Sequence, residues 1–347
     1  MSPPRRTQII ATLGPASRDP AVLRRMVEEG LDWARLNCSR DEPEVAQRAA
    51  ETLRTVAAAA GRPVRLLADL GGAKVRVGIV PEPIPLEVGT EVVLGAGRAA
   101  PDAVPVTVPR AFAHLAVGEM IALDNGAIEL EVIDADPGWV RCRVLSGRMI
   151  RSHQSLAIAG NDPSAITDRD EEDLAAALAL GVDAVALSRV RRREDATALR
   201  ARLPDGVLAF AKIEDAEGLR NLDGILDAAD AVVCVRGSLG FSLPRAAVPF
   251  VQKDLLAWCA GRGRSGIVAS ELFRSMVERP TPMRVEIADV VTAMLDGAVG
   301  LVLSEESAVG AYPAEAVAEL RQVIERAEDS AWFQALERGS SRPAMLE

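Results

Sequence analysis

Short apolar runs alternate along this chain with longer stretches in which apolar residues recur every three to four positions. In the first part, apolar runs at 8–13, 33–37 and 64–70 are separated by amphipathic stretches at 20–29 and 42–60. The short runs predict buried strands, and the amphipathic stretches predict helices. Strands that alternate with helices in this way indicate a parallel sheet covered by helices.

The alternation stops between about residues 75 and 160. This segment is punctuated by Pro and Gly, and its short runs of alternating polarity predict strands at 90–94, 120–123, 128–133 and 139–145. Such a pattern is typical of a small all-β insert. We therefore expect an all-β lid domain at 75–160.

The strand and helix alternation resumes with a helix predicted at 169–180, whose start at Thr167 to Asp170 supplies capping side chains. Further strands are predicted at 184–187, 207–213, 231–235, 266–269 and 300–303. Three strands before the insert and five after it predict an α/β fold, a closed (β/α)8 TIM barrel of residues 1–74 and 161–347. The alternative is an open doubly wound sheet, which the lack of a G-x-G-x-x-G sequence disfavours.

Polar residues follow the predicted strands, where (β/α)8 barrels carry their active sites. A polar group at one strand end usually only caps that strand, but a set from seven of the eight strands would converge on one mouth. The set comprises Arg35, Asn37, Ser39, Asp69, Ser188, Lys212, Glu214, Arg236 to Ser238, Ser270, Glu271 and Ser304.

Lysine is rare in this chain, which has only Lys74, Lys212 and Lys253 among its 40 basic residues. Lys212 and Glu214 are two positions apart on a predicted strand, so their side chains point to the same side. An ordinary ion pair at a strand end is the simplest interpretation, and a catalytic ammonium beside a carboxylate is the alternative.

Composition excludes several classes of function. A net charge of -10 and a single Tyr argue against a nucleic-acid surface. No apolar run approaches the roughly 20 residues of a membrane span, and no signal peptide is apparent, so a cytoplasmic location is expected. Scattered cysteines and only two His argue against a zinc site, a disulfide framework or histidine-based catalysis. The basic cluster at 189–193 is better explained as a solvated helix start than as an anion site.

The chain resembles the pyruvate kinase family from about Arg6 to Val317. The resemblance is carried by a set of motifs: Thr7-Gln-Ile-Ile-Ala-Thr-Leu-Gly-Pro-Ala-Ser17, Ala34-Arg-Leu-Asn-Cys-Ser39, Asp69-Leu-Gly-Gly-Ala-Lys-Val-Arg-Val-Gly78, Leu123-Asp-Asn-Gly126, Ala211-Lys-Ile-Glu-Asp-Ala-Glu-Gly218, Val235-Arg-Gly-Ser-Leu-Gly240, Val251-Gln-Lys253, Leu295-Asp-Gly297 and Tyr312-Pro313. The resemblance implies the family's barrel with its lid and a glycolytic kinase that uses phosphoenolpyruvate, ADP and Mg²⁺ or Mn²⁺.

The resemblance also implies roles for individual residues. Lys212 and Arg35 would contact the transferring phosphoryl group, and Glu214 would hold the divalent metal. Such charges suit phosphoryl transfer, in which catalysis is largely positioning and charge compensation. Backbone N–H groups of Gly237 and Ser238 at a helix start, with the Ser270 hydroxyl, would bind the substrate carboxylate.

A monovalent cation site is implied at Asn37, Ser39, Asp69 and Leu70. In the potassium-independent branch of the family a Lys stands at the position of Lys74, so its ammonium would replace the ion. We therefore expect no potassium requirement. Nucleotide binding would fall to Arg76 in the lid.

The chain departs from the family pattern at several positions near this site. Ser238 stands where the second carboxylate ligand of the metal is expected, which should weaken metal binding. Glu271 is a speculative replacement ligand. Further departures are Arg189, Ser270, Glu305, Arg40 with Asp41, and Gln154 in place of a nucleotide-contacting Lys.

The family's usual C-terminal allosteric domain is expected to be absent, and with it effector regulation through that domain. Partners are expected to be small molecules. A homo-oligomer through the barrel helices is left open.

Three functions remain open from the sequence. The first is a divergent pyruvate kinase. The second is a same-barrel lyase or aldol-type enzyme acting on the enolate of a 2-oxo acid. The third is a catalytically silent protein that binds phosphoenolpyruvate or pyruvate, which the substitution at Ser238 favours.

Overall fold

The computed structural model describes residues 5–72, 75–95, 102–107, 112–113, 115–123, 126–152, 154–158, 165–331 and 333–334. The chain forms two compact units. The barrel unit comprises Met1–Gly71, Ile166–Leu239 and Leu243–Glu347, and the inserted unit comprises Gly72–Ala165 with Gly240–Ser242. The two units are described separately.

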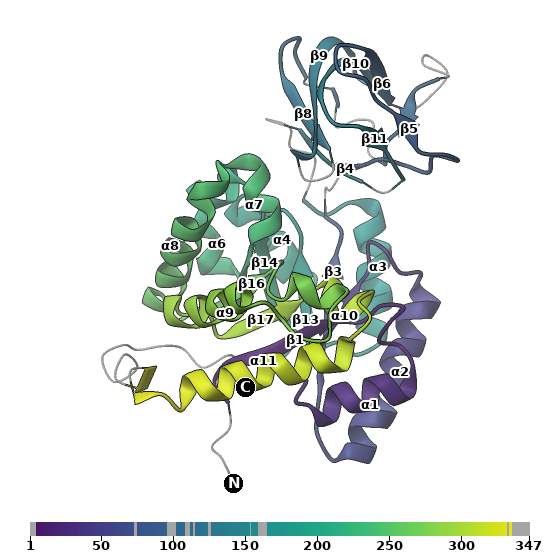
Figure 1. Ribbon diagram of the computed structural model, residues 1–347. Helices are drawn as coiled ribbons and strands as arrows, with labels where there is room; N and C mark the ends of the chain where they lie inside the picture. The colour runs from purple at the N-terminus through teal and green to yellow at the C-terminus, as the bar shows by residue number, and fades with distance from the viewer. Residues whose placement is uncertain are drawn as a thin grey trace. The chain divides into compact units, whose positions relative to one another are not determined.

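Eight parallel strands close the barrel, as the alternation predicted (Figure 1). Their order around the barrel is β1-β17-β16-β15-β14-β13-β3-β2. The strands are β1 (Gln8–Thr12), β2 (Trp33–Asn37), β3 (Arg65–Leu70), β13 (Ala184–Leu187), β14 (Leu208–Ile213), β15 (Ala231–Val235), β16 (Ser265–Ala269) and β17 (Gly300–Leu303). β3 pairs directly with β13, with Leu67 opposite Ala184, although the inserted unit separates them in sequence.

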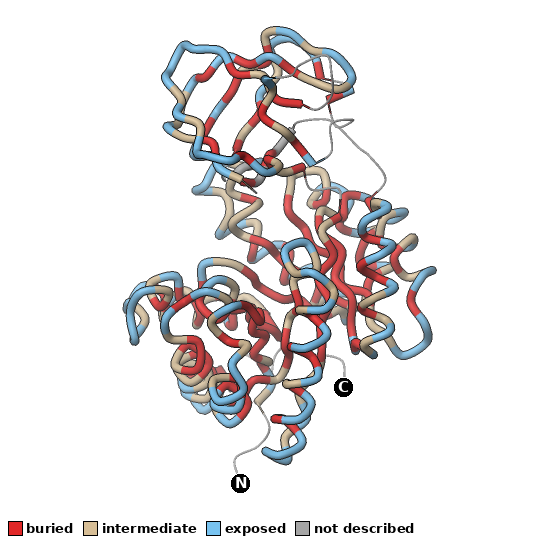
Figure 2. Tube along the Cα trace, turned by 90° about the vertical axis from the view of Figure 1, so that its right-hand side faces the viewer, coloured by how far each residue is buried: buried red, intermediate tan, exposed pale blue. Residues whose placement is uncertain are grey.

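The barrel interior is filled by side chains from alternate strand positions. Trp33 and Phe210 are its largest members, and their ring centroids lie 5.8 Å apart. The Trp33 indole N–H donates to Gln8 Oε1, which satisfies the one polar atom of that ring. Figure 2 shows the strand segments of this unit buried and the surrounding helices exposed on their outer sides. The barrel is therefore a packed core, and its polar groups lie at the strand ends.

Helices follow the strands as predicted. They are α1 (Pro20–Glu28), α2 (Pro43–Ala60), α3 (Asp168–Ala179), α4 (Arg193–Arg200), α5 (Ala216–Arg220), α6 (Leu222–Ala228), α7 (Arg236–Ser242), α8 (Val248–Gly261), α9 (Arg284–Asp296), α10 (Glu305–Ala308) and α11 (Pro313–Glu328), with 3-10 helices η3 (Arg245–Ala247) and η4 (Arg274–Val277).

Local sequence signals explain several helix ends. Asp19 caps α1 by accepting from two backbone N–H groups, and Pro20 occupies the first helical position. Thr167 and Asp170 form a reciprocal capping box on α3. Gly61 ends α2 at φ 62°, a left-handed conformation that glycine adopts without strain.

The described part of the inserted unit between Gly72 and Ala165 consists mainly of β-strands. They are β4 (Val75–Arg76), β5 (Ile84–Pro85), β6 (Glu91–Gly95), β7 (Val104–Pro105), β8 (Met120–Leu123), β9 (Ile128–Asp136), β10 (Trp139–Ser146), β11 (Met149–Ile150) and β12 (Ser155–Ile158). Seven of them form one sheet in the order β4-β12-β8-β9-β10-β6-β7, and β11 pairs with β5. The inward positions of β10, Val140, Cys142 and Val144, are fully buried in the core of this unit.

The basic cluster at 189–193 differs from the solvated helix start expected of it. Arg191 is buried, and its Nε lies 2.8 Å from Asp215 Oδ2. Arg192 and Arg193 are exposed at the start of α4 and also form ion pairs, with Glu217 and Asp227. The buried position of Arg191 is thus compensated by Asp215, which follows the next barrel strand.

No helix among the described residues is long and apolar enough to cross a membrane.

Candidate active site

Lys212 lies near the carboxyl end of β14 and is almost completely buried. Its ammonium donates to both carboxylate oxygens of Asp69, each at 2.9 Å, and to the Ser188 hydroxyl at 2.8 Å. Asp69 is on β3 and Ser188 directly follows β13, so three consecutive barrel strands supply this cluster. A buried ammonium needs such partners, because burial of an isolated charge is costly.

Arg35 on β2 is the second cation at Asp69. Its Nε donates to Asp69 Oδ2 at 2.6 Å, and its Nη1 donates to Thr12 Oγ1 at 2.8 Å. Both oxygens of the Asp69 carboxylate are therefore engaged by cationic side chains. This carboxylate fixes Arg35 relative to Lys212.

Glu214 follows β14 and is also buried. Its Oε1 lies 3.4 Å from the Lys212 ammonium, and its Oε2 accepts from the Ser238 hydroxyl at 3.1 Å. Lys212 and Arg35 carry two positive charges, and Asp69 and Glu214 carry two negative charges. The charges of this cluster thus balance.

The oxygen atoms of Glu214 and Ser238 are the groups that could bind a divalent ion at this position. A carboxylate and a neighbouring hydroxyl are oxygen donors of the kind that Mg²⁺ and Mn²⁺ prefer. Among the described residues, no group of three or more His, Cys, Asp or Glu side chains is arranged to hold a metal. The residues fit a weakly held ion that takes most of its ligands from substrate oxygens and water.

Gly237, Ser238 and Ser270 lie close together beside Glu214. A Cβ added to Gly237 would stand 3.4 Å from the Ser270 Cβ, which is ordinary van der Waals contact, so the two segments lie side by side. Ser270 and Glu271 adopt φ of 79° and 58°, in the left-handed region that residues other than glycine rarely occupy. The Glu271 side chain is exposed, whereas Glu214 is buried.

The residues expected to bind a monovalent cation lie at the ends of β2 and β3. Ser39 Oγ donates to Asn37 Oδ1 at 2.8 Å, and the Cys38 N–H donates to the Asp69 carbonyl at 3.1 Å. Leu70 is the last residue of β3 and is fully buried. Lys74 lies outside the described residues.

Arg76 and Gln154 belong to the inserted unit. The Arg76 N–H donates to Thr107 Oγ1 at 3.0 Å. Gln154 is nearly buried, and its Oε1 accepts from the Arg151 N–H at 2.7 Å. Gln154 therefore stabilises a turn within that unit.

Sequence reasoning missed three features of the site. Ser188 was noted only as a polar strand end, although its hydroxyl holds Lys212. Thr12, at the end of β1, was not singled out, although it accepts from Arg35. Glu306 is buried and accepts from the N–H groups of Phe273 and Ser304, which ties the ends of β16 and β17 together. For Thr12 the available signal was a polar residue in an apolar run, whereas Glu306 stands among polar neighbours and gave no such signal.

Burial raises the pKa of the Cys38 thiol to about 12, and the Asp69 and Asp173 carboxylates act in the same direction. The thiolate is the nucleophilic form of cysteine. The raised pKa therefore disfavours the thiolate of Cys38 at physiological pH.

Comparison with known proteins gives one consistent family. The family model for the pyruvate kinase barrel domain matches residues 4–317. Pyruvate kinases from Geobacillus stearothermophilus, Methylorubrum extorquens and Mycobacterium tuberculosis are 35%, 34% and 36% identical over 94%, 95% and 92% of this chain. The matched regions cover 57%, 70% and 70% of those proteins.

Proposed function

Because this chain belongs to the pyruvate kinase family, we propose that it is a phosphotransferase that moves the phosphoryl group of phosphoenolpyruvate to ADP, giving pyruvate and ATP. The observation that carries the proposal is the buried ammonium of Lys212, which Asp69 and Ser188 hold at the barrel mouth. Phosphoryl transfer needs fixed positive charge where oxygens gain negative charge.

Lys212 and Arg35 supply that charge in the proposed mechanism. Asp69 fixes the two side chains relative to each other, so little reorganisation is needed when a phosphoryl group arrives. Lys212 also stabilises the enolate left after transfer. Loss of one such stabilising group typically lowers turnover by about 10² to 10³-fold.

The substrate carboxylate is proposed to bind at Gly237, Ser238 and Ser270. The backbone N–H groups of Gly237 and Ser238 and the hydroxyl of Ser270 are donors, and Gly237 lies within van der Waals range of Ser270. Donors of this kind fix one end of the substrate, so that the phosphoryl end faces Lys212 and Arg35.

Glu214 is proposed to hold the divalent ion, with the Ser238 hydroxyl beside it. When bound, Mg²⁺ or Mn²⁺ would act as a Lewis acid toward substrate oxygens. Glu271 stays a speculative further ligand. The Glu214 Oε1 atom also lies 3.4 Å from the Lys212 ammonium, a contact that does not depend on the ion.

Independence from potassium is proposed on the resemblance at Lys74. The contacts of Asp69 support it, because both carboxylate oxygens are already neutralised by Lys212 and Arg35. Asn37, Ser39 and Leu70 would then keep a structural role at the ends of β2 and β3. Arg76 is proposed to contact the nucleotide.

The substitution at Ser238 favours a second candidate function. The Ser238 hydroxyl bonds to Glu214 where the family places a second carboxylate, so metal binding is weakened. A same-barrel lyase or aldol-type enzyme that uses the enolate of a 2-oxo acid would still be served by Lys212 and Glu214. A silent protein that binds phosphoenolpyruvate or pyruvate would need only the carboxylate donors.

A coupled assay of pyruvate formation from phosphoenolpyruvate and ADP, run with Mg²⁺ and with Mn²⁺, tests the proposal. The kinase predicts wild-type turnover that Lys212→Ala removes. If the wild type is inert and Ser238→Asp gains turnover, the scaffold has drifted from this activity. If both are inert while 2-oxo acids still raise the melting temperature, the second candidate function or a silent binding protein replaces the kinase.

Self-association through the outer barrel helices is also proposed. Phe250 and Trp258 on α8 are 68% and 48% exposed, and they lie two helical turns apart on one face. Large exposed apolar side chains on one face are typical of protein interfaces. Light scattering of the wild type and of Phe250→Glu would show a dimer and its loss. The cytoplasm is proposed as the location, where small-molecule substrates of this kind would be met.

A further inference from the structure

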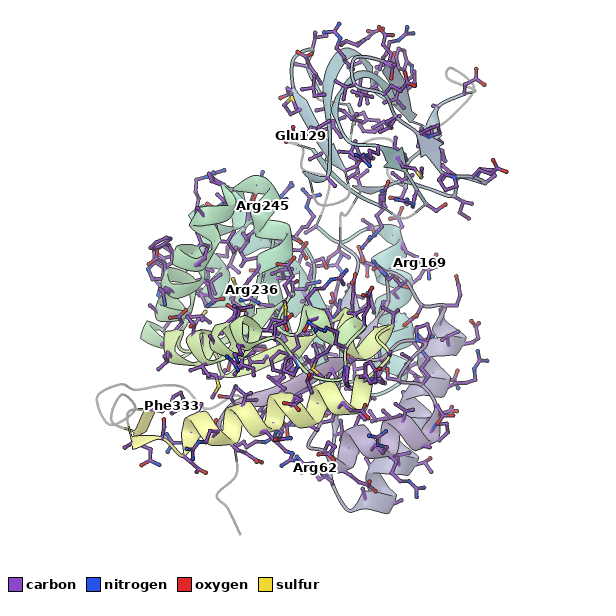
Figure 3. All side chains as sticks on the ribbon, in the orientation of Figure 1. Arg62, Glu129, Arg169, Arg236, Arg245 and Phe333 are labelled. Carbon is purple, nitrogen blue, oxygen red and sulfur yellow. The ribbon has the colours of Figure 1, made fainter. Side chains whose placement is uncertain are left out.

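Arg236 makes contacts with the Ser270 segment that no assigned role explains. It is the first residue of α7, and Figure 3 labels it on the barrel unit. Its Nη2 donates to the carbonyl oxygens of Ser270 at 2.8 Å and Glu271 at 3.0 Å, and its Nε donates to the Ser270 carbonyl at 3.2 Å. One guanidinium thus bridges two successive carbonyl groups.

The guanidinium is itself anchored from the other side. Its Nη1 donates to Asp289 Oδ2 on α9 at 2.6 Å and to Gln252 Oε1 on α8 at 3.4 Å. Gln252 is buried, and its amide donates to Asp296 Oδ2 at 2.8 Å. The planar fork of arginine makes several directed hydrogen bonds at once, which an ammonium could not reproduce.

The segment that Arg236 holds is conformationally disfavoured. Ser270 and Glu271 have φ of 79° and 58°, and neither residue is a glycine. Residues in this region persist only where the surroundings hold them there, and such residues concentrate at functional sites. The two carbonyl groups that accept from Arg236 belong to these same two residues.

The neighbour of Arg236 meets the same segment. A Cβ on Gly237 would stand 3.4 Å from the Ser270 Cβ and 3.5 Å from its Oγ. Arg236 therefore binds the Ser270 backbone, and the next residue, Gly237, lies within van der Waals range of the Ser270 side chain. Two successive residues of α7 thus lie against Ser270.

We propose that Arg236 is a positioning residue that holds Ser270 in its left-handed conformation, so that the Ser270 hydroxyl faces the substrate carboxylate. The proposal rests on the proposed function for the identity of the ligand. Its conformational part is independent of any ligand. Arg236 does not touch substrate and acts only through Ser270.

Arg236→Lys tests the proposal, because it keeps the positive charge and removes the planar guanidinium that donates several hydrogen bonds at once. Lysine cannot reproduce the three hydrogen bonds that Arg236 donates to the Ser270 and Glu271 carbonyl groups. The KM for phosphoenolpyruvate should therefore rise about 10-fold and kcat should fall far less, since carboxylate binding is shared by ground state and transition state. Arg200→Lys is the matched control. Arg200 also bridges a carboxylate, on Asp230, and a carbonyl, on Pro204, but it lies outside the site.

A rescue variant separates positioning from a general loss of stability. Glycine adopts positive φ without strain, so adding Glu271→Gly to Arg236→Lys should restore much of the lost affinity. A KM that rises no more than in Arg200→Lys, or a double variant with no gain over Arg236→Lys, overturns the proposal.

Hydrogen exchange supplies the readout that needs no substrate. In Arg236→Lys the amides of residues 270–273 should exchange about 10-fold faster than in the wild type, because opening of this segment becomes easier. In Arg200→Lys they should be unchanged. Unchanged exchange in Arg236→Lys overturns the proposal even if the kinase assay succeeds. If exchange is faster in Arg236→Lys but the wild type shows no turnover, the positioning role of Arg236 stands and only the proposed kinase function is rejected.

Discussion

Asp69 accepts hydrogen bonds from the Lys212 ammonium through both of its carboxylate oxygens, and Arg35 donates to one of the same two oxygens. The three side chains come from β14, β3 and β2, and all are substantially buried. A single carboxylate thus determines where two cations stand.

Asp69→Asn should destabilise the protein and lower turnover. The amide keeps the shape but leaves two cations without their shared anion, and breaking a buried ion pair costs about 3–5 kcal/mol. Urea unfolding followed by circular dichroism measures the loss. Asp223→Asn is the control, because Asp223 pairs with Arg262 on the surface and should cost no more than about 1 kcal/mol. Equal losses in the two variants would contradict the role given to Asp69.

Ser238→Asp should strengthen metal binding. A second carboxylate beside Glu214 supplies the charged oxygen that a hard divalent ion prefers, so Mn²⁺ affinity should rise by at least about 10-fold. Electron paramagnetic resonance of free Mn²⁺ during titration measures this without any assay of turnover. Ser238→Ala serves as the control and should not bind more tightly than the wild type. Tighter binding by both variants would show that the ion binds elsewhere.

The free energy of unfolding should fall as the pH rises above about 9, and ionisation of the Cys38 thiol should account for part of this fall. Burial raises its pKa from 9.0 to about 12, so between these values the unfolded chain loses the proton while the folded protein keeps it. Stability therefore declines through this window, by up to about 1.4 kcal/mol per pH unit for one thiol.

Urea midpoints between pH 8 and 11 measure that decline, and Cys38→Ala should make it shallower. Cys142, Cys234 and Cys259 are buried thiols with pKa values raised in the same way, so part of the decline remains in the variant. An unchanged slope in Cys38→Ala would show that this thiol ionises normally.

Replacing potassium by tetramethylammonium should leave turnover essentially unchanged. The Asp69 carboxylate already has Lys212 and Arg35 as counter-charges, and Lys74 is expected to supply a further one. Lys74→Met is the diagnostic variant, since removal of this ammonium should make activity respond to potassium. Loss of wild-type activity in tetramethylammonium would contradict independence from potassium.

The barrel strands could be predicted from the sequence because each is a short apolar run between turn residues. The strands at 184–187, 231–235 and 300–303 were placed with their observed ends. Two-residue strands such as β4, β5, β7 and β11 were missed, because a pair of residues carries no alternation. Because the strands of such a barrel are parallel, the sequence also predicted that the polar residues at their carboxyl ends would lie near one another.

The contacts within the site could not be predicted in the same way. A strand end gives the position of Lys212, but whether its ammonium meets Asp69, Ser188 or Glu214 depends on rotamers and on spacing across the barrel. The left-handed backbone at Ser270 and Glu271 could not be predicted either. Positive φ is expected at Gly or Asn, and neither residue is present at these two positions. Arg191 was expected in solvent because its acidic partner, Asp215, follows the next strand.

The pairing of β3 with β13 has a consequence for how this chain folds. The two strands meet only after the chain has closed a loop from Leu70 to Ala184, which includes the inserted residues Gly72–Ala165. Loop-closure entropy grows slowly, so a loop ten times longer costs only about 2 kcal/mol more. The insertion therefore costs little equilibrium stability, but it delays formation of this strand pair in the barrel. Replacing residues 72–165 with a short Gly-Ser linker should speed refolding of the barrel.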